Sequence, residues 1–89
     1  MQTIQSYLLR TTADINNARK ELSDDKCSNF CTKAYKWLAS MKRGTRLDLT
    51  KYAGDKLKWT VWACCWWMYD PLSKGEYTFS NDYRYFIHE

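Results

Sequence analysis

Apolar side chains recur at helical spacing through the first half of the chain. From residue 3 to 22, and again from 26 to 43, they follow one another three or four positions apart, which keeps them on one side of a helix. These two stripes consist of Ile4, Leu8, Thr11, Ile15, Ala18 and Leu22, then Cys27, Phe30, Cys31, Ala34, Trp37, Leu38 and Met41. The pattern predicts helices over 3–22 and 26–43, the second ending at Gly44, packed as an antiparallel helical hairpin.

The segment 49–69 ends in the most apolar stretch of the chain, Trp59–Tyr69, which holds four of the five tryptophans and no charge. As a helix, the segment places one set of side chains on an inward stripe. That stripe consists of Leu49, Ala53, Leu57, Thr60, Cys64 and Trp67. The aromatic and β-branched composition favours a strand instead, and Gly54 costs a helix interior about 1 kcal/mol. Periodicity favours a helix over 49–69, with a strand as the alternative.

The last segment, 76–88, alternates aromatic and polar residues around Ser80-Asn81-Asp82. This pattern predicts a β-hairpin with one aromatic face. That face consists of Tyr77, Phe79, Tyr83, Tyr85 and Ile87. Thr45–Leu49 is expected to be a connection only. Residues 1–89 therefore predict a single α+β domain, mostly helical, with a helical hairpin, a third apolar segment and a C-terminal β-hairpin.

Charge is concentrated in the middle of this 89-residue chain. The net charge is +4, but Lys26–Thr60 contains nine basic and two acidic residues. Such a region is typical of a face that docks on an acidic partner or on nucleic acid, or of lysines that solvate helix surfaces. No export signal and no apolar run long enough to span a membrane is found. We therefore expect no membrane association and a cytoplasmic location, in the host cytoplasm if a phage encodes the protein.

The chemistry-bearing residues do not form a catalytic or metal-binding motif. The cysteines occur as Cys27-x3-Cys31 and as the adjacent pair Cys64-Cys65, and adjacent cysteines diverge on a helix and chelate zinc poorly. Buried, reduced thiols are favoured over zinc ligands. His88, the single histidine, is expected to be solvated or on an edge strand. With no phosphate-binding loop or nucleophile motif, we expect neither an enzyme nor a cofactor.

Binding is the function that the composition favours. We expect a non-enzymatic inhibitor or adaptor that docks an aromatic and basic surface on a larger protein or ribonucleoprotein. In general make-up, without a shared motif, the chain is similar to small phage accessory proteins, including anti-defence inhibitors. The expected partner-binding residues are Trp59, Trp62 and Trp66, with Lys51, Lys56, Lys58, Lys33, Lys36, Lys42, Arg43 and Arg46. We expect these tryptophans to stay partly exposed, opposite the inward stripe.

Two other functions compete with this one. Basic residues next to aromatic ones are typical of proteins that bind single-stranded nucleic acid, where tryptophan and tyrosine rings stack on bases. The region Lys26–Thr60 has this composition. The heptad-like stripes of the first two helices also suit a structural homo-oligomer, most simply a homodimer.

Overall fold

The computed structural model of the protein describes residues 3–21, 25–69 and 75–89, except for the side chains of 25–28, 31 and 67–69. The elements, in which η denotes a 3-10 helix, are η1 (Ile4–Tyr7), α1 (Thr12–Glu21), α2 (Asp25–Ala39), β1 (Arg46–Asp48), η2 (Leu49–Lys51), α3 (Gly54–Tyr69), β2 (Tyr77–Phe79) and β3 (Tyr85–His88). The predicted α+β, mostly helical class is confirmed, with three α-helices and a C-terminal antiparallel hairpin in these ranges.

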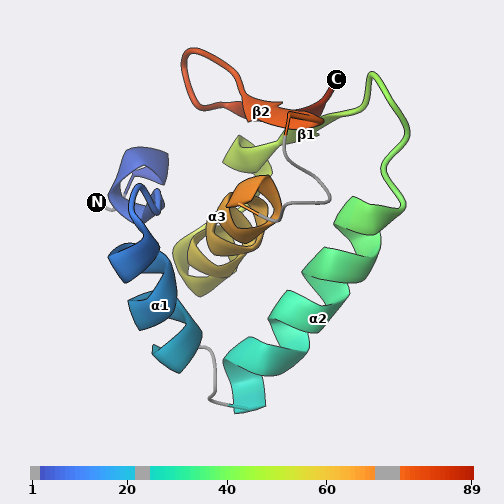
Figure 1. Ribbon diagram of the computed structural model, residues 1–89. Helices are drawn as coiled ribbons and strands as arrows, with labels where there is room; N and C mark the ends of the chain where they lie inside the picture. The colour runs from blue at the N-terminus through green and yellow to red at the C-terminus, as the bar shows by residue number, and fades with distance from the viewer. Residues whose placement is uncertain (1–2, 22–24, 70–74) are drawn as a thin grey trace.

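The central element is α3, which lies between α1 and α2, with the sheet to one side of the helices (Figure 1). Every residue from Trp59 to Cys65 is buried. A helix that is apolar all round is stable only when neighbours cover all its sides, and this enclosure outweighs the strand propensity of its residues. The helix predicted over 49–69 is therefore confirmed from Gly54 onward. It does not include Leu49–Lys51, and Gly54 turns the chain into α3 at φ +57°.

The helix predicted over 3–22 is wrong in its first half. Residues 8–11 are not helical, and α1 starts only at Thr12. The Thr11 side chain accepts a hydrogen bond from the Asp14 backbone N–H (3.1 Å), which makes Thr11 the N-cap of α1. The break turns Leu9 inward, where its backbone N–H donates to the Cys65 thiol (3.4 Å). Local capping thus overrides the continuous stripe.

The second predicted helix is shorter than expected, because α2 ends at Ala39. Gly44 does not cap it. At φ +85°, Gly44 lies in the turn that leads into β1, and its backbone N–H donates to the His88 carbonyl (2.7 Å). The first two helices run in opposite directions, but α2 packs mainly on α3, which lies between them (Figure 1).

The predicted hairpin is confirmed, but it is part of a three-stranded antiparallel sheet of order β1-β3-β2. The connection expected at Thr45–Leu49 contains β1, because Leu47 pairs with Phe86 and both side chains are buried. β3 is therefore the central strand. His88 is half-buried on this central strand and not on an edge strand, and its Nδ1 donates to the Met41 carbonyl (2.8 Å) while its ring stacks on Tyr77 (4.3 Å).

The hairpin's predicted aromatic face is wrong in register. Phe79 pairs with Phe86, so Phe86 and not Tyr85 or Ile87 shares the inner face with Tyr77 and Phe79. The cause is the connection between the strands, in which Tyr83 adopts φ +59°. Tyr85 and Ile87 consequently lie on the outer face of the sheet with Arg46 and Asp48.

Candidate partner-binding surface

The tryptophans are distributed differently from the prediction. Trp37, assigned to the inward stripe of the second helix, is 40% exposed, the highest value of any large apolar side chain in the described residues. Trp59 and Trp62, expected to be exposed, are each only 8% exposed. The expectation fails because α3 is covered on several sides. Trp66 is half-buried, with its ring stacked on Tyr35 (5.9 Å). The Trp67 side chain lies outside the described residues.

The Lys58 side chain makes intramolecular contacts with two tryptophan rings and with a carboxylate. Its ammonium nitrogen lies 4.7 Å from the ring centroid of Trp59 and 4.8 Å from that of Trp62, and these two rings meet edge to face. The same nitrogen forms an ion pair with Glu21 of α1. Lys58, Trp59 and Trp62 therefore connect α3 to α1, and a partner cannot reach the two indole rings without displacing this contact.

An apolar groove of about 600 Å³ opens between η1 and the junction of η2 with α3. Its lining residues come from these three elements and the segments beside them: Thr3, Ile4, Gln5, Tyr7, Leu49, Thr50, Tyr52, Ala53, Gly54 and Leu57. Tyr52 also contacts Trp37 edge to face, with ring centroids 6.2 Å apart. Burial raises the pKa of the Tyr52 hydroxyl above its usual value. We call the exposed Trp37 ring, Tyr52 and this groove the Trp37 face.

Unpaired lysines adjoin the Trp37 face. Lys33 lies one helical turn before Trp37 on α2, and Lys36 is its neighbour in sequence, while Lys51 and Lys56 adjoin groove-lining residues. All four are exposed, and within the described ranges none of them forms an ion pair. Asp55 is the acidic residue in the same stretch of α3. An apolar groove with exposed lysines at neighbouring chain positions suits an acidic partner with apolar anchor residues.

The remaining predicted basic residues lie elsewhere. Lys42 and Arg43 are exposed in the turn before β1, and Arg46 lies on the outer face of the sheet. There the Arg46 guanidinium carbon is 4.3 Å from the Tyr85 ring centroid. The structure thus divides the predicted basic surface into two parts, one at the Trp37 face and one at the sheet.

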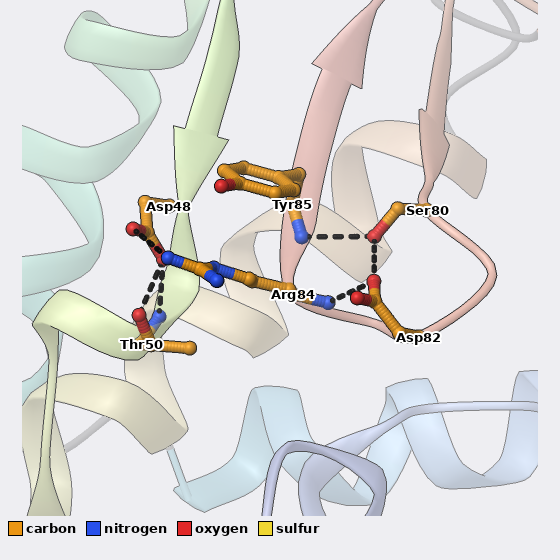
Figure 2. Close-up of polar contacts among 6 residues, drawn as sticks. All are labelled: Asp48, Thr50, Ser80, Asp82, Arg84 and Tyr85. Atoms are coloured by element: carbon orange, nitrogen blue, oxygen red, sulfur yellow. Dashed lines mark hydrogen bonds and ion pairs between the residues drawn. The ribbon is translucent and has the colours of Figure 1, made fainter.

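A polar network supports the outer sheet face (Figure 2). Asp48 accepts hydrogen bonds from the Thr50 hydroxyl and backbone N–H, which lower the pKa of its carboxyl group, and it pairs with Arg84 (3.4 Å). Hydrogen bonds from Ser80 and from the Arg84 backbone N–H likewise lower the pKa of Asp82. In return, the hydrogen bond to Asp48 raises the pKa of Arg84.

The described cysteines are core residues. Cys64 and Cys65 are free and buried, and burial raises the pKa of Cys65 to about 11 and that of Cys64 well above its usual value. Within the described ranges, no three His, Cys, Asp or Glu side chains come together as metal ligands. The predictions for the side chains of Cys27 and Cys31 lie outside the described residues.

Sequence reasoning missed two residues of these surfaces, Tyr52 and Arg84, and it placed Tyr85 on the wrong face of the hairpin. It also misplaced Trp37, which it assigned to the core. One weak signal indicated that Trp37 is exposed: Lys33 and Lys36 lie on the same side of the helix as Trp37. The prediction instead assigned Trp37 to the core because its side chain is apolar. Several stripe residues behind the homodimer hypothesis are buried in the core of the single chain: Ile15, Ala18, Ala34, Leu38 and Met41.

Comparison with known proteins identifies no relative of this chain, which matches no protein-family model, no curated protein and no solved structure. In the part of the chain that the structure describes, no helix combines the length and apolar character needed to cross a membrane.

Proposed function

We propose that this protein is a non-enzymatic binding protein of the inhibitor or adaptor type, which docks its Trp37 face on an acidic surface of a larger protein in the cytoplasm. The observation that carries the proposal is the 40% exposure of Trp37 beside a groove of about 600 Å³. Tryptophan is among the residues most enriched in binding hot spots, and a groove next to it offers a pocket for a partner's apolar side chain.

The charges around the groove support an acidic partner. Exposed lysines that form no ion pair with another described residue can form one across an interface: Lys33, Lys36, Lys51 and Lys56. Rim charges of this kind speed association and select the partner more than they strengthen the complex. We therefore expect Trp37 to determine the dissociation rate and the lysines to determine the association rate and its dependence on salt.

The test is affinity capture from the source cell, followed by titration of the captured partner with purified variants. Trp37→Ala should weaken binding by about 30-fold or more, the range of a hot-spot tryptophan. The double variant Lys33→Glu, Lys36→Glu should slow association, and this effect should fade at high salt.

The matched control is Lys42→Glu, Arg43→Glu, which makes the same charge change outside the Trp37 face, and both double variants are titrated against nuclease-treated partner. A partner that binds Trp37→Ala as well as wild type, or that loses equal affinity to both double variants, would contradict docking through this face. Capture that vanishes after nuclease treatment would contradict a protein partner.

A further inference from the structure

The outer face of the sheet carries a second basic and aromatic surface, which the Trp37 face does not include. The guanidinium carbons of Arg46 and Arg84 lie 4.3 and 5.1 Å from the ring centroid of Tyr85. We call these three residues the Arg46 cluster. Arg84 is also anchored by its ion pair with Asp48, as Figure 2 shows, so the cluster is held from two sides.

Arg46 is the free cation of this cluster. Within the described ranges it forms no ion pair, although Arg84 beside it does. Contact with an aromatic ring restrains a guanidinium group while leaving its N–H donors able to bind an anion. The planar fork of donors matches two oxygens of a phosphate group, and the guanidinium plane can stack on a nucleobase. Arg46 therefore suits a ligand that contains both a phosphate group and a nucleobase.

The cations near this cluster follow the direction of β1. Lys42 and Arg43 precede the strand, and the hydrogen bond from Gly44 to the His88 carbonyl (2.7 Å) holds their turn against the end of β3. Arg46 lies within β1, and Arg84 lies beyond its far end, where Asp48 pairs with Tyr85. From Arg43 to Arg46 the chain could span at most roughly 10 Å, and the turn at Gly44 brings the two residues closer than that. A row of cations suits a linear polyanion better than an isolated carboxylate.

We propose that the Arg46 cluster binds the backbone of single-stranded nucleic acid, with Arg46 and Arg84 on phosphates and a base stacked against the guanidinium plane of Arg46. This site is separate from the Trp37 face. A partner that offers both an acidic protein surface and exposed nucleic acid, such as a ribonucleoprotein, would engage the two together, and each site can be tested without the other.

The direct test is fluorescence anisotropy with a labelled single-stranded oligothymidylate of about 15 nucleotides, with its duplex and a poly-glutamate of similar charge as competitors. We expect the single strand to bind, and log affinity to fall with log salt at a slope of about −0.7 per phosphate contact. Arg46→Ala should weaken binding about tenfold and reduce this slope by about 0.7. Arg46→Lys, which keeps the charge but loses the planar fork, should fall between Arg46→Ala and wild type.

A variant that strengthens binding separates this role from structural damage. Asp48→Asn removes the carboxylate that competes with phosphate for Arg84, and asparagine can still cap η2. We expect Asp48→Asn to raise the affinity several-fold. Lys36→Ala and Trp37→Ala, on the other surface, should leave oligonucleotide binding unchanged.

Three results would overturn the proposal. The first is no binding of the oligothymidylate at tens of micromolar protein in low salt. The second is equal loss of affinity in Lys36→Ala and Arg46→Ala, which means that net charge alone attracts the strand. The third is full displacement by poly-glutamate at equal charge, which assigns the Arg46 cluster to an acidic protein. None of these results bears on the Trp37 face, because its own test uses the captured protein partner.

Discussion

The rings of Trp37 and Tyr52 meet edge to face, with their centroids 6.2 Å apart, at the rim of the apolar groove. This contact connects α2 to the segment between η2 and α3. It holds the exposed indole in one orientation, which reduces the entropy that Trp37 loses when a partner covers it. The Trp37 face is therefore a preformed surface, whereas a tryptophan on a mobile loop would first have to be ordered.

Tryptophan truncation should separate the core from the binding surface. Trp59→Ala and Trp62→Ala should each reduce the free energy of unfolding by about 3–5 kcal/mol, because both rings are buried in a domain whose total stability is about 5–15 kcal/mol. Trp37→Ala should cost much less stability, since water already reaches 40% of its surface. Urea denaturation of the three variants measures this order. A Trp37→Ala variant that unfolds as readily as Trp59→Ala would place Trp37 in the core.

Lys58 should stabilise the fold more than its ion pair alone suggests. Glu21→Gln should cost less than about 1 kcal/mol, because the Glu21 side chain is 49% exposed and water screens the pair. Lys58→Ala should cost more, since it also removes the ammonium group and the alkyl chain from the faces of Trp59 and Trp62. Chemical denaturation compares them, with the exposed Lys56→Ala as the control. Equal costs for Glu21→Gln and Lys58→Ala would show that the aromatic contacts add nothing.

Cys64 and Cys65 should resist alkylation in the native protein. Both are buried, and the pKa of Cys65 is raised to about 11, so little thiolate forms near pH 8. Iodoacetamide labelling, mapped by mass spectrometry, should modify these two cysteines only after urea is added. Rapid labelling without urea would contradict their enclosure.

The same burial predicts a loss of stability in alkali. An unfolded thiol has a pKa of about 8.5, and the folded values are higher, so between about pH 9 and 11 the folded state retains protons that the unfolded state releases. The free energy of unfolding should therefore decrease as the pH rises through this range. Melting temperatures of wild type and of Cys64→Ala, Cys65→Ala measure this decrease, which should be smaller in the variant.

Acid should weaken the fold through Asp48 and Asp82. Hydrogen bonds lower the pKa of both carboxyl groups, so the stability they contribute is present above an unfolded pKa of about 3.9 and is lost as the pH falls through the lower folded values. Thermal melts between pH 7 and 2 should show a smaller acid effect in Asp48→Asn, Asp82→Asn than in wild type. An identical pH profile in the variant would show that these hydrogen bonds do not persist in solution.

The sequence alone identified the features that depend on local pattern. The helical periodicity around Ile15 and Ala18, the aromatic alternation from Tyr77, and the apolar stretch after Trp59 predicted elements of the observed type. The sequence also contains a signal for the break before α1, because Thr11 and Asp14 have the spacing of an N-terminal capping motif. The helix predicted over 3–22 from periodicity did not take this signal into account. Periodicity reports which residues share one side of an element, and this property is local.

Only the tertiary structure decided which of these sides are covered. Trp59 and Trp62 lie off the inward stripe, yet they are buried because α3 has neighbours on several sides. Trp37 lies among apolar positions, yet it stays exposed. In the sheet, Arg46–Asp48 forms a strand because it pairs with β3. The register that pairs Phe79 with Phe86 places Tyr85 on the outer face. Burial and register depend on neighbours distant in sequence, whose positions no local pattern contains.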